Sequence, residues 1–365
     1  MTPDPARYAR QVATPGVGPE GQRKLAGARV LLVGAGGLGS PAALFLAGAG
    51  VGTLTLVDDD RVEVSNLHRQ VVHTTSRTGE YKVDSARAAL DDLNPEVEVR
   101  TVRDRVTRDN ALDLLSGHDL VLDGCDDFAT RYVVSDATTV LGIPHVWASV
   151  LATGGQLSVF DPDRGPVYRD VFPSAPPAGS VPSCAQAGVI GTVPGILGTA
   201  MAAEALKIIL GIGHPLVGTL AVYDMLTAEW DRVPVARNPR VARPTTPDDI
   251  GRDIHQPDPV EALAAALGTA LVVDVREPEE FAAGAVPGSV NVPVATVEAD
   301  PAAVHAAAGS RPVWVYCRTG VRSARAAEAL RTVAPALSGP ETHDSTIHDT
   351  AGGWEAWVRR IGREY

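Results

Sequence analysis

The segment from Cys317 to Arg322 combines a thiol, a glycine and two arginines in a way that predicts sulfur chemistry. The apolar run that ends at Tyr316 predicts a strand, and the residues from Ser323 onward predict a helix. A thiol on such a strand-to-helix turn faces backbone N–H groups and the positive end of a helix dipole. Arg318 and Arg322 add positive charges, so we expect an anionic, nucleophilic sulfur.

A glycine-rich turn near the N-terminus predicts a nucleotide site. A predicted strand, 28–33, runs into the pattern GxGxxG and then into a predicted helix, 39–49. Glycines let the backbone approach phosphate groups, and a helix N-terminus binds their negative charge. The next predicted strand ends at an aspartate, where ribose is recognised in such folds. The expected contacts in this region are Gly34, Gly36, Gly37, Gly39 and Asp58.

The residues that follow Asp58 favour ATP over a redox dinucleotide. Lys82 is one of only three lysines among 32 basic residues, which indicates a role that a guanidinium does not fill. Asp126 and Asp127 follow a predicted strand, 120–123. Cations stabilise phosphate charge and a carboxylate holds magnesium, so we expect ATP and Mg²⁺ at this site. The other expected contacts are Asp60, Ser65, Asn66, Leu67, His68, Arg69, Gln70 and Asp127.

The elements that must position these residues alternate between strand and helix patterns over 28–232. The expected strands are 28–33, 53–58, 96–102 and 120–123, and the expected helices are 39–49, 82–94 and 110–115. Such alternation implies an α/β fold with a doubly wound, mostly parallel sheet. We therefore expect a first domain over 1–232, a Pro-rich linker over 233–257 and a smaller α/β domain over 258–365.

Composition and charge exclude several classes of protein. The net charge of -12 argues against nucleic-acid binding, which depends on neutralising phosphates with Lys and Arg. Cys125, Cys184 and Cys317 form no CxxC pair, so neither a disulfide framework nor a cysteine-only zinc site fits, and we expect a cytoplasmic location. The apolar run 187–203 contains Pro194 and glycines, so we expect a buried loop and helix rather than a membrane span.

Residues 6–232 resemble the MoeB and ThiF family, whose members adenylate ubiquitin-like sulfur carriers. The matching motifs are RYARQ at 7–11, Gly34–Gly39, Asp58, Asp60, Ser65–Gln70, Lys82, Asp126, Tyr168–Asp170 and Ser183–Val189. Nearly the whole chain is similar to the MoeZ type, in which this domain is fused to a rhodanese. The resemblance implies a homodimeric, ATP-dependent enzyme that acts on a carrier with a C-terminal Gly-Gly.

The resemblance also implies roles for single residues. In the family pattern Gly37 lies against the phosphates, Asp58 binds ribose, and the phosphates contact Asn66, Arg69 and Lys82. The pattern further assigns a magnesium-binding and catalytic carboxylate, an arginine that reaches the partner subunit's ATP, and a second catalytic cysteine. These correspond to Asp126, Arg10 and Cys184.

Two departures from the family pattern affect these expectations. Members with zinc carry two CxxC pairs, whereas the stretches 167–170 and 237–242 contain no cysteine, so we expect no zinc. Asp127 stands where the family usually has Asn, which adds a negative charge beside the expected triphosphate.

Residues 258–365 resemble rhodanese domains. The matching segments are Val272–Phe281, Gly284–Pro293 and Gly352–Trp357. The six-residue loop is similar to that of the sulfurtransferases, because the related phosphatases have a loop one residue longer. The resemblance implies a persulfide on the cysteine and a loop formed by Cys317, Arg318, Thr319, Gly320, Val321 and Arg322.

Together the two resemblances predict an enzyme that installs sulfur on a carrier protein. The carrier's terminal carboxylate attacks the α-phosphate of ATP, and a persulfide on Cys317, charged by thiosulfate or a persulfide donor, displaces AMP. Cys184 then frees the thiocarboxylate, or first forms a thioester. Two alternatives are an NAD-dependent oxidoreductase fused to a rhodanese module and a carrier-binding scaffold with an inactive nucleotide site.

Overall fold

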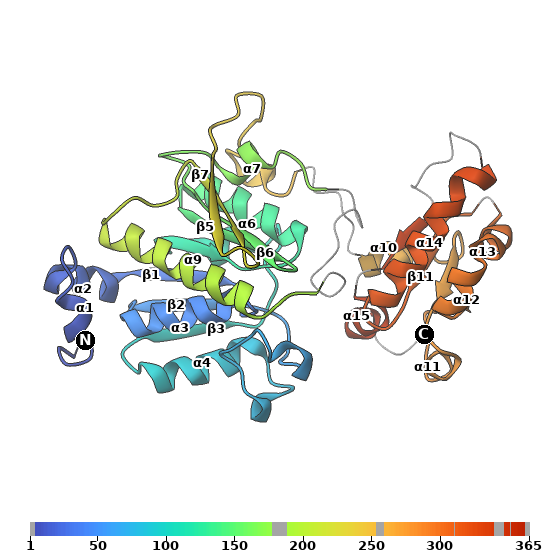
Figure 1. Ribbon diagram of the computed structural model, residues 1–365, viewed down its shortest axis with the longest axis horizontal. Helices are drawn as coiled ribbons and strands as arrows, with labels where there is room; N and C mark the ends of the chain where they lie inside the picture. The colour runs from blue at the N-terminus through green and yellow to red at the C-terminus, as the bar shows by residue number, and fades with distance from the viewer. Residues whose placement is uncertain are drawn as a thin grey trace. The chain divides into compact units, whose positions relative to one another are not determined.

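The computed structural model describes residues 4–176, 188–252, 259–309, 311–338, 347–350 and 352–361. The chain divides into two compact units (Figure 1): the larger includes Met1–Ala175 and Gly188–Ile254, and the smaller includes His255–Tyr365. Each unit has its own sheet and its own hydrophobic core.

The larger unit is built on an eight-stranded sheet of order β3-β2-β1-β4-β5-β6-β7-β8. The strands from β3 to β5 pair in parallel, and those from β5 to β8 pair antiparallel. This arrangement confirms the mostly parallel, doubly wound sheet. The strands are Arg29–Val33, Thr53–Val57, Glu98–Val102, Leu120–Asp123, His145–Leu151, Gly154–Phe160, Thr219–Asp224 and Glu229–Pro234, numbered β1 to β8.

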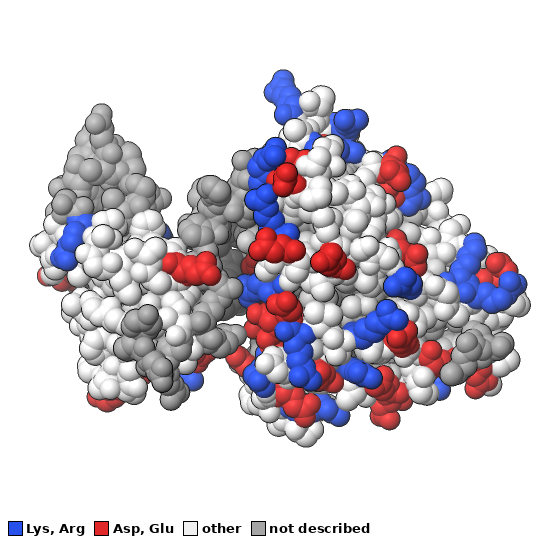
Figure 2. Space-filling model, turned by 180° about the vertical axis from the view of Figure 1, so that it is seen from behind, with Lys and Arg blue, Asp and Glu red and all other residues white. Residues whose placement is uncertain are grey.

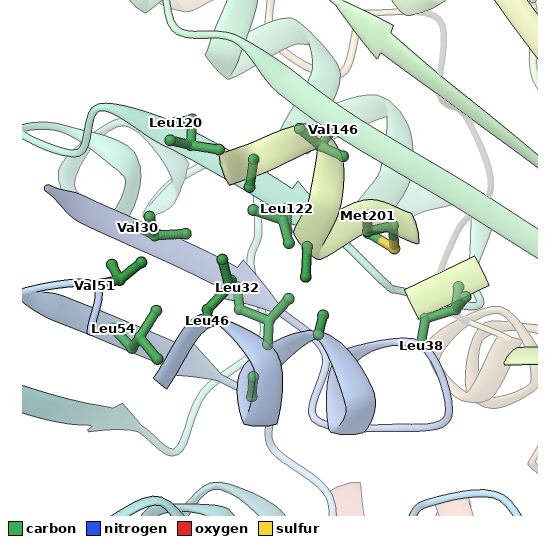
Figure 3. Packing of buried hydrophobic residues seen from close by; sticks show 14 of the residues in the cluster. Val30, Leu32, Leu38, Leu46, Val51, Leu54, Leu120, Leu122, Val146 and Met201 are labelled. Atoms are coloured by element: carbon green, nitrogen blue, oxygen red, sulfur yellow. The ribbon is translucent and has the colours of Figure 1, made fainter. Parts of the chain in front are cut away.

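Helices cover both faces of this sheet. Because side chains alternate along β1, Val30 and Leu32 pack with α3 and α9 on one face (Figure 3), whereas Leu31 and Val33 pack with α5 and α6 on the other face. All four side chains are at most 4% exposed, as expected for a parallel strand covered on both sides. The helices are α3 Gly39–Ala49, α4 Lys82–Leu93, α5 Ala111–Leu115, α6 Phe128–Leu141 and α9 Thr192–Leu210.

Helix α9 is long and apolar enough to cross a membrane by length and composition, but half of its most apolar window is buried inside the protein. Val193, Leu197 and Met201 are fully buried in the core, and a Cβ at Gly198 would lie only 2.2 Å from Leu38 O. The expected buried helix is therefore found, and glycine allows its close approach to the loop before α3.

The segment that the sequence predicts as a linker differs from that expectation in its described part, 233–252. Arg243 donates to Asp170 Oδ2 at 2.7 Å, and Gly251 N donates to Asp136 Oδ2 at 2.9 Å. Ile250 is fully buried in the core that contains α5 and α6. These contacts attach the Pro-rich segment to the larger unit, which thus extends beyond residue 232.

Surface charges of both signs are interspersed over the larger unit on the face seen in Figure 2. Several neighbouring side chains form exposed ion pairs, among them Arg23 with Glu20 and Arg77 with Glu80. Such pairs contribute little to stability because solvent screens them.

The smaller unit has a four-stranded parallel sheet of order β10-β9-β11-β12. Its strands are β9 Leu271–Asp274, β10 Val290–Asn291, β11 Val313–Tyr316 and β12 Ile347–Asp349. One face of this sheet packs against α12, α13 and α14, and the other face packs against α10 and α15. The helices are α10 Pro259–Ala266, α11 Pro278–Ala282, α12 Val294–Ala299, α13 Pro301–Ala308, α14 Val321–Ser338 and α15 Gly353–Arg360.

Candidate active sites

The glycine-rich turn lies where the chain order of the large sheet changes direction, between β1 and β4. Gly34 has a φ of +87°, and a Cβ there would lie 3.0 Å from Gly124 O in the loop after β4. A Cβ at Gly39 would collide with Gly34 O at 1.9 Å. Only glycine fits these two positions, and ligands of open α/β sheets bind at this switch point.

Asp58 holds the turn in place. Its Oδ2 accepts a hydrogen bond from Ala35 N at 2.8 Å, and its Oδ1 accepts one from Asp60 N at 2.8 Å. Burial raises the pKa of Asp58, while the charge of Lys82 opposes the rise. The predicted position of Asp58 beside the glycine-rich turn is therefore confirmed, and its contact with ribose stays a prediction.

Lys82 is the buried cation of this site. Its Nζ lies 2.9 Å from Asp60 Oδ2, and its side chain is 8% exposed. Burial lowers the pKa of Lys82, but the charges of Asp58 and Asp60, and more weakly that of Asp126, raise it above its ordinary value. The lysine is therefore held as a cation among carboxylates, suited to receive phosphate charge.

Asp126 follows β4, and its charge acts on Lys82. Burial of its carboxyl group among protein atoms and then the charge of Asp127 raise the pKa of Asp126, although the residue as a whole is exposed. Asp127 has a second role, because its Oδ1 accepts from Thr130 N at 2.7 Å and caps α6. Asn caps a helix equally well, so the cap explains why either residue type fits this position.

The segment 65–70 lies over the glycine-rich turn. A Cβ at Gly37 would lie 3.6 Å from Arg69 Cγ, and one at Gly36 would lie 3.6 Å from Gln70 Nε2. The Arg69 guanidinium bonds within its own segment, to Asn66 Oδ1 at 2.9 Å, Ser65 O at 3.2 Å and His68 Nε2 at 2.8 Å. Leu67 is half-buried and offers no polar side-chain group.

Two further residues near the site, His73 and Arg105, belong to no motif that is recognisable in the sequence. His73 bridges Ala35 O and Ser85 Oγ, each at 3.0 Å. Burial lowers the pKa of His73, so the neutral ring donates from Nε2 and accepts at Nδ1. Arg105 places its Nε 3.7 Å from Asp59 Oδ2. Burial lowers the pKa of Arg105, but the opposing charges of four carboxylates raise it above its ordinary value. These carboxylates belong to Asp59, Asp127, Asp60 and Asp126.

Arg10 does not lie at the glycine-rich turn of its own chain. It belongs to α1, Ala9–Val12, and is exposed. The neighbouring Gln11 donates to Ala49 O at the last residue of α3, whereas the glycine-rich turn precedes the first. A helix of 11 residues is about 16 Å long, so α1 and the turn lie at opposite ends of α3. The expected second cysteine, Cys184, falls outside the described residues.

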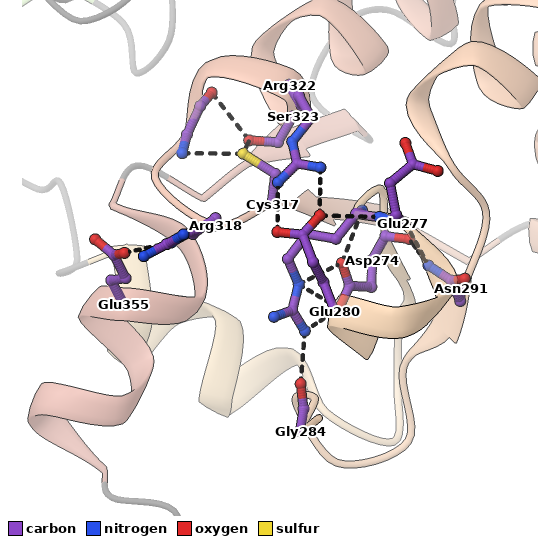
Figure 4. Close-up of polar contacts among 12 residues, drawn as sticks. Asp274, Glu277, Glu280, Gly284, Asn291, Cys317, Arg318, Arg322, Ser323 and Glu355 are labelled. Atoms are coloured by element: carbon purple, nitrogen blue, oxygen red, sulfur yellow. Dashed lines mark hydrogen bonds and ion pairs between the residues drawn. The ribbon is translucent and has the colours of Figure 1, made fainter. Parts of the chain in front are cut away.

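In the smaller unit Cys317 directly follows β11 and is 1% exposed (Figure 4). Gly320 N donates to Cys317 Sγ at 3.1 Å, and Ser323 Oγ lies 3.6 Å from the same sulfur. Gly320 has a φ of +108°, which turns its N–H toward the sulfur at the start of α14. The predicted strand, loop and helix around the thiol are confirmed, and the anionic state of the sulfur stays a prediction.

The two loop arginines, which we expect to add positive charge beside the sulfur, are each paired with a glutamate. Arg318 Nε donates to Glu355 Oε1 at 2.6 Å, and Arg322 donates to both oxygens of Glu280 at 2.6 and 2.8 Å (Figure 4). Hydrogen bonds from Arg322 lower the pKa of Glu280 to about 2. The glutamates cancel much of the positive charge. Thr319 and Val321, also in the loop, are exposed.

Hydrogen bonds join the two rhodanese-like stretches, Val272–Phe281 and Gly284–Pro293. Arg276 pairs with Asp274 in the interior and donates to Gly284 O at 2.6 Å. Asn291 Nδ2 donates to the backbone oxygens of Asp274 and Arg276 at 3.0 and 2.8 Å. These bonds position β9, which is the neighbour of β11, the strand that directly precedes the cysteine.

Comparison with known families agrees with both sites. Residues 8–243 match the ThiF family, and residues 257–360 match the rhodanese-like domain. The E. coli enzyme MccB has a similar fold: the match covers 66% of this chain and 73% of the MccB chain, with a TM-score of 0.60 at 19% identity.

Curated relatives match most of the chain. A sulfur carrier protein adenylyltransferase of Thermus thermophilus is 51% identical over 64% of this chain and 88% of its own. The probable adenylyltransferase/sulfurtransferase MoeZ of Mycobacterium tuberculosis is 37% identical over 98% of this chain and 93% of its own. The mouse adenylyltransferase and sulfurtransferase MOCS3 is 38% identical over 97% of this chain and 85% of its own. The chain belongs to the ThiF family and is an adenylyltransferase and sulfurtransferase with a rhodanese-like domain.

Proposed function

We propose that the larger unit adenylates the C-terminal glycine of a ubiquitin-like sulfur carrier, and that the smaller unit supplies the sulfur that converts this glycine to a thiocarboxylate. The observation that carries the proposal is the convergence of Lys82, Asp58 and Asp126 beside the glycine-rich turn. The relatives' names, which include a sulfur carrier protein adenylyltransferase, support the choice of substrate.

In the first step the chain binds ATP and orients its α-phosphate toward the carrier's terminal carboxylate. The backbone of the glycine-rich turn lies against the phosphates, and Lys82 and Arg69 neutralise their charge. A carboxylate oxygen forms a bond to the α-phosphorus, the bond to the β-phosphate oxygen breaks, and pyrophosphate leaves. The carrier then carries an acyl-adenylate, whose AMP is a good leaving group.

Mg²⁺ fits the donor set at this site. Among the residues that the structure describes, no three His, Cys, Asp or Glu side chains form a preformed metal cluster. Magnesium is usually held by one or two carboxylates together with substrate phosphates, and Asp126 supplies such a carboxylate. The bound ion would neutralise charge that develops on the phosphates, while Asp60 and Asp58 keep Lys82 in place.

In the second step the sulfur comes from a persulfide on Cys317. The Cys317 thiolate takes the outer sulfur of thiosulfate and releases sulfite, or takes that of a persulfide donor and releases the donor's thiolate. The terminal persulfide sulfur attacks the acyl carbon, AMP leaves, and an acyl-disulfide links the carrier to Cys317. A thiolate, which the family resemblance assigns to Cys184, attacks the Cys317 sulfur and releases the thiocarboxylate. The resulting disulfide between the two cysteines returns to thiols through an external thiol reductant.

We further propose a cytoplasmic homodimer in which Arg10 of one subunit reaches the ATP of the other. The position of α1 at the far end of α3 supports an action in trans, because Arg10 is exposed and remote from its own glycine-rich turn. A guanidinium supplied by a partner neutralises phosphate charge as an arginine finger does.

The test of the adenylation step is carrier-dependent exchange of labelled pyrophosphate into ATP. The candidate carriers are small ubiquitin-like proteins from the same genome that end in Gly-Gly, and the matched control is the same carrier with its C-terminal carboxylate converted to an amide. Exchange with the intact carrier alone is the expected result. Equal exchange with both carriers would exclude the terminal carboxylate as the group that is activated.

A further inference from the structure

The residue before Asp126 is held at both ends of its backbone. Cys125 N donates to Asp123 Oδ1 at 3.0 Å, and Cys125 O accepts from Arg131 Nη2 at 3.1 Å. Together the two bonds fix the rotation about the Cα–C bond of Cys125, and because the next peptide is planar, they also fix the position of Asp126 Cα. Asp126 is itself exposed, so its place depends on bonds that its neighbours make.

The residue after Asp126 is fixed by the start of α6. Asp127 Oδ1 accepts from Thr130 N at 2.7 Å, and Asp127 O accepts from Arg131 N at 3.3 Å. Arg131 therefore holds both neighbours of Asp126, one through its side chain and the other through its backbone. The helix cap needs only ordinary helix chemistry, whereas the anchor on Cys125 needs charged groups in the interior.

The carboxylate that holds Cys125 N has a fixed orientation. Asp123 ends β4 and is fully buried. On the neighbouring strand β5, His145 is 1% exposed and places its Nε2 3.3 Å from Asp123 Oδ2. Each oxygen of the carboxylate thus has a partner, and Oδ1 is directed at Cys125 N.

Stability alone does not account for Arg131 at this place. Arg131 is 5% exposed, and its Nε is buried without a hydrogen-bond partner in the described part of the chain, which is unfavourable. The rings of Phe128 and Trp147 have their centroids 5.0 and 5.5 Å from Arg131 Cζ and hold the guanidinium in one orientation. An apolar side chain could fill the same space without a buried charge, but it would leave Cys125 O without this donor.

Given the metal-binding role proposed above for Asp126, on which this inference rests, we propose that Arg131 and Asp123 are positioning residues that hold Asp126 where its carboxylate meets Mg²⁺ and the triphosphate. Both side chains are buried, so they act through the backbone of Cys125 and not by contact with the substrate. Loss of either bond lets the Asp126 backbone move, which weakens its hold on the metal and leaves Lys82 in place.

The first test needs neither metal nor nucleotide. Amide hydrogen exchange, followed by mass spectrometry, compares the peptide that contains residues 124–127 in the full-length native protein and in Arg131→Met. Methionine keeps an apolar stem and removes the donor. Exchange in this peptide should be about tenfold faster in the variant. Tyr132→Phe is the matched control, because it removes one hydrogen bond made by the next residue of α6, to Phe172 O, and should leave the peptide unchanged.

The second test is the affinity for ATP, measured by isothermal titration calorimetry with and without Mg²⁺. Asp126→Ala should lose the part of the affinity that Mg²⁺ adds. Arg131→Met should weaken ATP binding in Mg²⁺ about tenfold, the lower end of what residues around a metal's ligands contribute, and leave binding without Mg²⁺ unchanged. Added to Asp126→Ala, the Arg131→Met change should weaken binding by less than about twofold, because it acts through that carboxylate.

Three results would overturn the inference and leave the proposed function intact: equal hydrogen exchange in the native protein and Arg131→Met, the same acceleration in Tyr132→Phe, or a loss of ATP affinity that adds in full to that of Asp126→Ala. An Asp126→Ala protein that keeps the whole effect of Mg²⁺ would instead overturn the proposed metal ligand, and the positioning role with it.

If thermal unfolding shows that Arg131→Met does not fold, two variants of Asp123 decide the question. Asp123→Leu removes the acceptor of Cys125 N, Asp123→Asn keeps an oxygen there, and the two side chains are similar in size. The Leu variant alone should show faster exchange in 124–127 and weaker binding of ATP in Mg²⁺. Equal exchange and equal affinity in the two variants would contradict the proposal.

Discussion

Lys82 Nζ lies 2.9 Å from Asp60 Oδ2, although 22 residues separate the two in the chain. The pair joins the start of α4 to the loop after β2, directly beside the glycine-rich turn. Asp60 is 44% exposed at its side chain, whereas Lys82 is 8% exposed. The carboxylate therefore orients a buried cation whose charge a phosphate group can share.

Replacing Lys82 by Met should lower carrier-dependent pyrophosphate exchange by at least about a hundredfold, because it removes a cation from the phosphates. Lys82→Arg should not restore the rate, since a planar guanidinium does not fit a slot that encloses a primary amine. Initial rates at saturating carrier test both variants. Full activity of Lys82→Arg would show that the space around the Lys82 amine also accepts a guanidinium.

The Asp126→Ala variant should lose adenylation and still form the persulfide on Cys317. In the proposed mechanism its carboxylate acts where metal and triphosphate meet, and the smaller unit has a separate core. Pyrophosphate exchange and mass spectrometry of the thiosulfate-treated protein measure the two activities. Asp127→Asn is the control, because Asn preserves the helix cap. An Asp126→Ala protein that exchanges at the native rate would show that the nucleotide site has been misplaced.

The Glu280–Arg322 pair should stabilise the smaller unit in a pH-dependent way. The pKa of Glu280 falls from 4.5 to about 2, so the contribution is fully present above the unfolded value and is lost as pH falls through the folded one. Glu280→Gln should lower the free energy of unfolding by about 1 kcal/mol at neutral pH. Urea denaturation measures this loss.

The difference between Glu280→Gln and the native protein should shrink when denaturation is repeated between pH 4.5 and about 2. Glu279→Gln, next in the chain and on the same first turn of α11, is the matched control and should have a smaller effect. A Glu280→Gln penalty that is the same at every pH would show that the pair is not its source.

Dimer complementation tests the proposed role of Arg10. Arg10→Ala and Asp126→Ala proteins should each be inactive in adenylation, whereas their mixture should regain part of the activity, because hybrid dimers contain one intact site. Subunit exchange is verified by native mass spectrometry with one protein isotopically labelled. Exchange without any recovery of activity would exclude action in trans.

Contiguous motifs made much of both sites predictable. The positions of the glycines from Gly34 to Gly39, of the aspartate that follows β2 and of the thiol after β11 depend on local spacing, because strand ends and helix starts fix where such residues lie. The helix and strand pattern over 28–123 was equally readable, since each strand is buried on one or both faces.

Long-range pairs were not predictable in this way. Glu280 lies 42 residues before its partner Arg322, and Glu355 lies 37 residues after Arg318, so no local pattern shows that the loop arginines are neutralised. Arg105 belongs to no recognisable motif, and only the folding of the chain brings it close to Asp59. The Pro-rich segment looked like a linker because its anchors, Asp136 and Asp170, lie far away in sequence.

The most direct test of the central claim is mass spectrometry of a Gly-Gly carrier after incubation with the protein, ATP, Mg²⁺ and isotopically labelled thiosulfate or a persulfide donor. The native protein should give a carrier in which one terminal oxygen is replaced by labelled sulfur, with AMP and pyrophosphate released in equal amounts. Cys317→Ala should give the carrier adenylate without labelled sulfur. A labelled thiocarboxylate formed equally by Cys317→Ala, or no adenylate formed by the native protein, would contradict the account.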